Sequence, residues 1–120
     1  MITALLGTGH LPDFTGTILL LEDVQEPLYR IDRMLTQLKL AHVLDSVAGF
    51  VIGHFIDSEG IDLSLSVEKV LCGLIRDKAV PIISSYPHGH DLPNLTIPHG
   101  ARVRLIAEPN EETVGMVADA

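Results

Sequence analysis

Residues 84–100, SSYPHGHDLPNLTIPHG, contain three histidines and three prolines and follow neither a helical nor a strand period. Loops supply binding and catalytic groups more often than regular elements do. Histidine is both a common metal ligand and the side chain best suited to proton transfer near neutral pH. Three interpretations of this segment therefore arise: a metal site, one part of a catalytic apparatus, or a polar surface turn.

A metal site would use His88, His90, Asp91 and His99. Zinc favours histidine and carboxylate ligands, and the His-Gly-His segment offers two of them. However, Asp91 directly follows His90, which departs from the HxHxDH pattern of metallo-hydrolases. The chain also has neither paired cysteines nor an HExxH helix. We therefore rank a metal site low and expect no cofactor.

Nucleophilic catalysis needs a nucleophile, a general base and a group that orients the base. A histidine in this Pro/Gly-rich loop is a candidate base. Glu22, at the end of the apolar segment TILLLED, is a candidate orienting carboxylate, although a solvated strand-end residue is the simpler interpretation of Glu22 alone. The residues thus suggest a base and its partner, and the nucleophile is the missing component.

The chain offers weak candidates for that nucleophile. Ser84 and Ser85 follow a predicted strand without the glycine-flanked turn that presents an activated hydroxyl. Cys72 lies between Leu71 and Gly73 in a predicted helix, where we expect a buried, unreactive thiol. Residue chemistry alone therefore predicts half of a catalytic site.

The elements that would position these groups alternate between strand and helix. Short apolar runs between turn residues predict strands, and apolar residues spaced by three and four predict helices. The order β-α-β-α-β, a long loop and two antiparallel strands predicts an α/β domain with a mixed sheet and right-handed parallel crossovers. The predicted strands are 17–23, 47–55, 80–85, 101–107 and 113–117, with a turn at 108–112, and the helices are 26–44 and 66–78, the second capped by Ser66.

Composition narrows the class of protein. A chain of 120 residues fits one domain. Its formal net charge of −8 disfavours nucleic acid and anionic membranes as partners. One cysteine allows no internal disulfide, and the absence of Lys or Arg before Arg30 argues against an ordinary signal peptide. Because no apolar run is long enough to span a bilayer, we expect a soluble, cytoplasmic protein.

Two long segments carry a family resemblance: LLLEDVQEPLYRIDRML at 19–35 and PHGHDLPNLTIPHG at 87–100. Through them the chain resembles the C-terminal domain of the LD-carboxypeptidase family over nearly all of its 120 residues. These are serine peptidases of murein recycling, related to the microcin C immunity peptidases. The resemblance implies a swivelling three-layer β/β/α domain.

The resemblance also implies roles for individual residues. In the family, an N-terminal domain carries the serine and the oxyanion-hole amides, and the C-terminal domain supplies Glu and His of a Ser-His-Glu triad. By motif position these fall on Glu22 and His90. His88 stands where the family often has an apolar or aromatic residue, and His54 where an arginine is frequent, so neither receives a catalytic role.

The expected function follows from that resemblance. The chain, 1–120, would be the C-terminal half of a cytoplasmic enzyme that releases the terminal D-alanine from murein tetrapeptides. Residues 1–16 would be the remnant of an interdomain connection, and the chain alone would be inactive. An apolar surface for the absent domain, including parts of 1–12, and a possible homodimer are also expected. The alternatives are a microcin-immunity-type peptidase, a metal-binding domain, and a non-catalytic interaction domain.

Overall fold

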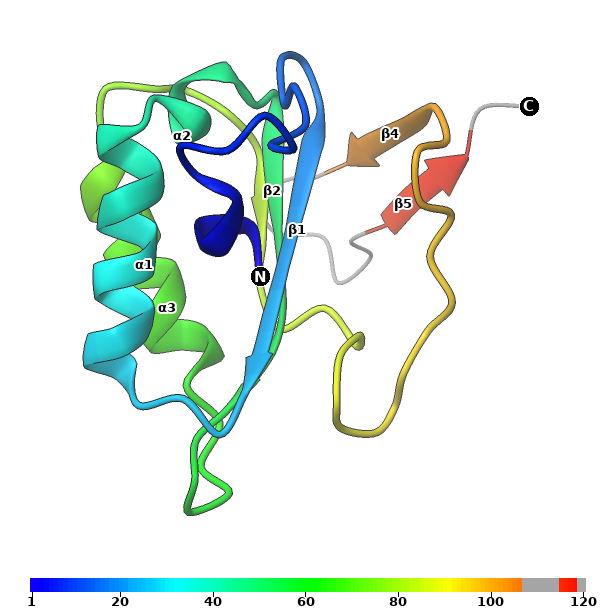
Figure 1. Cartoon of the computed structure of the whole chain (residues 1–120). Helices are drawn as coiled ribbons and strands as arrows, with labels where there is room; N and C mark the ends of the chain where they lie inside the picture. Colours follow the sequence, from blue (N-terminus) through cyan, green and yellow to red (C-terminus); the bar gives the residue numbers. More distant parts are fainter. Residues whose placement is uncertain (107–114, 119–120) are drawn as a thin grey trace.

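The computed structural model describes residues 1–106 and the backbone of residues 115–118. Its centre is a parallel three-stranded sheet in the order β1-β2-β3. Figure 1 shows α1 and α3 together on one face of this sheet, as expected when successive right-handed crossovers run in the same direction. The elements are β1 (Ile18–Val24), α1 (Leu28–Leu40), α2 (Val43–Ser46), β2 (Gly49–Ile56), α3 (Ser64–Leu74) and β3 (Ile82–Ile83).

A hairpin of β4 (Val103–Ile106) and β5 (Gly115–Ala118) forms the third layer. It lies on the other side of the central sheet from the helices (Figure 1). The α/β class and the β/β/α layering agree with the prediction. The antiparallel pair makes a sheet of its own instead of extending the parallel one, because the loop at 84–100 carries the chain away from β3. The predicted turn at 108–112 lies outside the described residues.

The hydrophobic core lies between the helices and the parallel sheet. β2 is its most buried strand, because it has a hydrogen-bonded neighbour on each side. Strands buried in this way read as continuous apolar runs, which explains the run at 50–52. The core residues of the helices repeat at helical spacing, namely Ile31, Leu35 and Leu38 in α1 and Val67 and Leu71 in α3.

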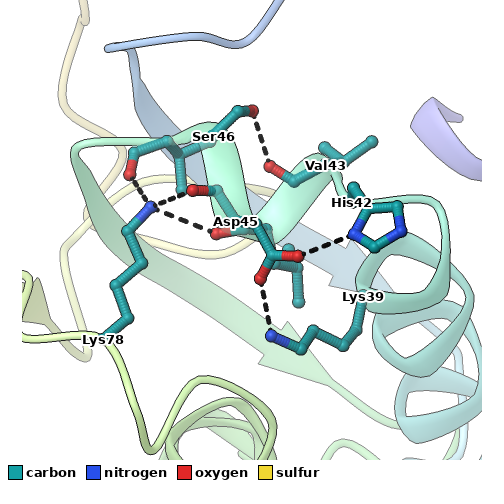
Figure 2. Close-up of polar contacts among 8 residues, drawn as sticks. Lys39, His42, Val43, Asp45, Ser46 and Lys78 are labelled. Atoms are coloured by element: carbon teal, nitrogen blue, oxygen red, sulfur yellow. Dashed lines mark hydrogen bonds and ion pairs between the residues drawn. The ribbon is translucent and has the colours of Figure 1, made fainter.

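The helix predicted at 26–44 is interrupted. α1 ends at Leu40, His42 adopts a left-handed φ of 60°, and α2 begins at Val43. Figure 2 shows the polar contacts around this break: Lys39 and His42 both contact the Asp45 carboxylate, at 2.6 Å and 3.0 Å. Hydrogen bonds from Lys39 and His42 lower the pKa of Asp45. The break thus depends on contacts that the apolar spacing does not encode.

Lys78 holds the end of α2 from a distant part of the chain. Its ammonium donates to the carbonyl oxygens of Leu44 at 3.4 Å, Asp45 at 2.7 Å and Val47 (Figure 2). Carbonyls at a helix C-terminus lack partners within the helix, and basic side chains commonly satisfy them. Lys78 therefore helps to end the helical segment just before β2.

The second predicted helix begins two residues earlier than Ser66. α3 starts at Ser64, whose N–H donates to the Asp62 carboxylate at 2.8 Å. The Ser64 hydroxyl in turn accepts a hydrogen bond from the Phe55 N–H at 3.3 Å. The prediction of Ser66 as N-cap was wrong because the true start is set by Asp62 and by a contact with β2.

Residues 1–16 form one turn of 3-10 helix, η1 (Ile2–Leu5), followed by irregular chain. Ile2, Leu6 and Leu11 pack against the core cluster, so most of this segment's apolar side chains are partly covered. β3 is also shorter than predicted, at two residues. Within the described residues, no helix has both the length and the apolar character needed to cross a membrane.

Candidate active site

Glu22 and His90 meet at the carboxyl end of the parallel sheet. Glu22 lies in β1, and its Oε2 is 2.8 Å from Nδ1 of His90 in the loop after β3. The two residues are 68 positions apart in the sequence. Glu22 is the more enclosed, with 26% of its side chain exposed against 62% for His90. The carboxyl ends of parallel strands are where open α/β sheets usually bind their ligands.

The contact selects one tautomer of the imidazole. An ionised carboxylate only accepts hydrogen bonds, so Nδ1 of His90 must be the donor to Glu22. Nε2 then carries the lone pair that a general base requires. The paired carboxylate also stabilises the imidazolium that forms after proton uptake. The arrangement can therefore perform general acid–base chemistry on a hydroxyl brought to Nε2.

A bulge in the β1–β2 pairing lies opposite Glu22. Leu21 pairs with Ile52 and Asp23 with Phe55, so the two residues between Ile52 and Phe55 face the single residue Glu22. β-bulges re-aim side chains and occur frequently beside active sites. This bulge places Gly53 and His54 of β2 next to the carboxylate.

Glycines let the histidine loop approach Glu22 closely. A Cβ added at Gly53 would lie 2.5 Å from the carbonyl oxygen of His88, and one added at Gly89 would lie 3.1 Å from Oε2 of Glu22. Gly89 also has a φ of +133°, which L side chains rarely adopt. The sequence analysis gives neither residue a role in the site, although a glycine inside a strand is a known sign of close backbone approach.

Gly53→Ala is expected to destabilise the fold by about 1–3 kcal/mol, because the new methyl group overlaps the His88 carbonyl and the loop must move away from β2. Urea unfolding of the purified chain measures this change. Gly73→Ala in α3 is the matched control, since a Cβ there meets nothing within 4 Å and alanine favours a helix by up to about 1 kcal/mol. Equal unfolding midpoints for Gly53→Ala and the wild type would contradict the close-approach interpretation.

Hydrogen bonds hold the loop against β2 and close it on itself. The Tyr86 N–H donates to Ile52 O at 2.9 Å, and the His54 N–H donates to His88 O at 2.8 Å. The Leu95 N–H donates to Pro87 O at 2.7 Å, which brings the two ends of the 87–95 segment together. Backbone hydrogen bonds therefore hold the loop that carries His90 in place, although it contains no helix or strand.

Side chains add two further contacts to the loop. Nε2 of His54 lies 3.0 Å from Pro93 O, and Nδ1 of His88 lies 2.8 Å from Leu95 O. The loop needs these contacts because an exposed ion pair, such as that of Glu22 with His90, contributes only about 0.2–1 kcal/mol to stability. Ordering one backbone residue costs about 1–2 kcal/mol. The contact between Glu22 and His90 therefore cannot by itself order the loop.

Two pockets border the Glu22–His90 pair. One, of about 460 Å³, is formed by the histidine loop and Glu22. The other, of about 510 Å³, runs between η1, β1 and α1, and His88, His90 and His99 line it together with Glu22. The pair thus faces space large enough for a small peptide-like ligand.

The histidines considered as metal ligands make other contacts in the structure. Nδ1 of His88 faces the Leu95 carbonyl, and Nδ1 of His90 faces Glu22. Within the residues that the structure describes, no three His, Cys, Asp or Glu side chains are grouped so that they could hold a metal ion. The geometry therefore favours proton transfer over metal binding at this loop.

The described part of the chain brings no strong nucleophile to the pair. Ser84, Ser85 and Cys72 line neither of the two pockets. Cys72 is exposed, so the prediction of a buried thiol was wrong: it lies on the outer side of α3, beside the core residue Leu71. Desolvation and the nearby Glu68 carboxylate raise the pKa of the Cys72 thiol, which disfavours the reactive thiolate.

The fold and the site define a β/β/α domain that presents a carboxylate–histidine pair. Residues 1–105 match the family model of the LD-carboxypeptidase C-terminal domain. A Synechocystis sp. protein assigned as a carboxypeptidase is 41% identical over 106 residues, which cover 86% of this chain and 35% of that protein. The chain therefore belongs to the LD-carboxypeptidase family, as its C-terminal domain. It spans about a third of the length of the curated relatives it matches.

Solved structures support the same assignment. The muramoyltetrapeptide carboxypeptidase from Oxalobacter formigenes is 30% identical, with a TM-score of 0.76 over 99% of this chain and 42% of that one. The microcin C7 self-immunity protein MccF is 22% identical, with a TM-score of 0.78 over 99% of this chain and 35% of that one. The likeness to MccF shows a common fold. A muramoyltetrapeptide carboxypeptidase and an immunity protein thus share this fold.

Proposed function

We propose that this chain supplies the general base and its orienting carboxylate to a serine carboxypeptidase that removes the terminal D-alanine from murein tetrapeptides. The observation that carries the proposal is the 2.8 Å contact between Glu22 Oε2 and His90 Nδ1. The similarity to a muramoyltetrapeptide carboxypeptidase supports the choice of substrate. We further propose a cytoplasmic location and a role in peptidoglycan recycling, because the tetrapeptide is a product of murein turnover.

In this proposal, an N-terminal domain of the same protein carries the serine and the oxyanion-hole amides. Nε2 of His90 takes the proton from the serine hydroxyl as its oxygen attacks the carbonyl carbon between diaminopimelate and D-alanine. The imidazolium then protonates the leaving amine of D-alanine, and an acyl-enzyme ester remains. Water, deprotonated by His90, hydrolyses that ester and regenerates the serine. Each step moves one proton through Nε2, and none requires a metal.

The exposed edge of the site has apolar side chains that are suited to contact with the proposed N-terminal domain. Leu92, with 84% of its surface exposed, and Leu95, with 47%, project from the loop beside His90. Apolar side chains at the edge of a site are typical of surfaces that pack against another domain. We propose that these residues contact the domain that brings the serine to Nε2. Pairing of two such proteins into a homodimer stays a prediction.

The chain alone is expected to release no D-alanine from a murein tetrapeptide, and the two-domain protein is expected to release it. The physical reason is that His90 can activate a hydroxyl only if one is present at Nε2. Chromatographic detection of free D-alanine measures both reactions. Cleavage by the isolated chain would overturn the assignment of roles, because an internal group would then be the nucleophile.

The same assay separates the two substrate classes of the family. Aspartyl sulfamoyl adenosine, the compound bound to MccF in one solved structure, serves as the competing substrate. A murein carboxypeptidase is expected to cleave the tetrapeptide much faster than this compound. The opposite preference would assign the protein to the immunity type and would leave the role of the Glu22–His90 pair unchanged.

A further inference from the structure

We propose that His54 and His88 are positioning residues that clamp the 87–95 loop so that the ring of His90 meets Glu22. This inference rests on the proposed function of the pair. The two clamp contacts are Nε2 of His54 with Pro93 O at 3.0 Å and Nδ1 of His88 with Leu95 O at 2.8 Å. Neither His54 nor His88 takes part in the proposed chemistry.

The two histidines hold the loop on both sides of His90. His54 acts twice: its backbone N–H donates to His88 O, two residues before His90, and its ring contacts Pro93 O, three residues after it. His88 closes the base of the loop by reaching Leu95 O. Because both acceptors are carbonyl oxygens, which cannot donate, each ring nitrogen must be the donor. The contacts therefore persist whether the imidazoles are neutral or protonated.

The position of His54 in β2 explains why it can contact the loop on both sides of His90. It lies in the bulge of β2 opposite Glu22, so the element that positions the carboxylate also positions the clamp. A Cβ added at Gly89 would lie 3.3 Å from Cβ of His54 and 3.1 Å from Oε2 of Glu22, so the loop passes close to both side chains. A shift of the loop relative to β2 would therefore change the position of His90 relative to Glu22.

The loop needs such a clamp because the pair itself is open to solvent. His90 has 62% of its side chain exposed, and an exposed pair of this kind contributes little to order. Catalysis depends on geometry, and a misplacement of about 1 Å can lower a rate about 100-fold. Holding the loop at residues 88, 93 and 95 is thus a way to preorganise a base that must stay accessible.

The test uses the tautomer of His90, observed by 15N NMR of the imidazole nitrogens in the 120-residue chain. The wild type is expected to show His90 mainly as the Nδ1–H tautomer, with a protected Hδ1 signal. His54→Asn, whose shorter amide cannot reach Pro93 O, and His88→Leu are expected to lose that signal. His54→Gln, which keeps a donor at the position of Nε2, and His88→Asn, which keeps one at Nδ1, are expected to retain it.

His10→Gln is the matched control, because His10 is exposed in the N-terminal segment and lines neither pocket. Backbone amide signals of β1 and β2 report whether each variant is folded. The proposal is overturned if His54→Asn and His88→Leu keep the wild-type Hδ1 signal, or if the donor-retaining variants lose it equally while their sheet signals persist. Should the clamp be confirmed while the two-domain protein releases no D-alanine, the proposed function fails and the clamp stands.

Discussion

His90→Gln in the two-domain protein is expected to lower kcat for D-alanine release by about 10³-fold or more. Removing the general base of a serine peptidase triad has effects of this size, because the serine hydroxyl is then not deprotonated as it attacks. Glutamine keeps a polar side chain of similar reach but cannot accept a proton at neutral pH. Because substrate binding does not depend on proton transfer, KM should change little. Steady-state kinetics with a murein tetrapeptide give both constants.

The control for this experiment is His99→Gln. His99 lines the larger pocket together with His90 and has no described contact with Glu22. Its replacement removes an imidazole from the same pocket, and we expect less than about a 10-fold change in kcat because no proton passes through it. A larger loss in His99→Gln than in His90→Gln would show that the base has been assigned to the wrong histidine.

Glu22→Gln is expected to lower kcat by about 10²–10⁴-fold. The variant keeps the shape of the site and removes only the charge. A glutamine amide can turn its NH₂ group toward Nδ1 of His90, which would place the ring proton on Nε2 and remove the lone pair that the serine needs. In other triads, loss of the orienting carboxylate has effects near the upper end of this range. Pre-steady-state kinetics should show that acylation and deacylation are both slowed, because His90 acts as the base in each step.

Asp23→Asn is the matched control for Glu22→Gln. Asp23 is the next residue of β1, and its carboxylate accepts the N–H of Val24 at 2.8 Å. The two variants remove the same charge one residue apart at the same pocket, but only the Glu22 carboxylate contacts His90, whereas that of Asp23 bonds the backbone of Val24. Activity should therefore be retained in Asp23→Asn. If the two variants lose activity equally, the effect comes from the net charge of the strand end and not from the contact with His90.

Much of the fold was predictable because its core is periodic. The strand at Ile18–Val24, the helix at Leu28–Leu40 and the antiparallel order of the last two strands follow from apolar spacing and turn residues. The predictions failed where distant groups decide a boundary. The end of α2 is held by Lys78, more than 30 residues away, and the start of α3 depends on Asp62 and β2.

Residue type and family motif also predict the candidate pair from the sequence. Glu22 follows a buried strand, and His90 lies in a rigid, polar loop. The structure brings these two side chains into contact, while their catalytic roles stay proposals. His54, Gly53 and Gly89 were not predicted as site components, because a bulge and the close approach of two backbones leave no periodic pattern in the sequence.

The sequence alone determined which chemical groups this protein has and the order of its elements, because side-chain type and hydrophobic period are local properties of the chain. Only the tertiary structure decided that the Glu22 carboxylate faces Nδ1 of His90 at 2.8 Å, and that His54 and His88 hold the loop between them. The physical reason is that these contacts join residues from separate elements. Their geometry depends on the β1–β2 bulge and on two glycines that allow the loop to approach β1 and β2 closely. These features join segments that are close in space but distant in the sequence.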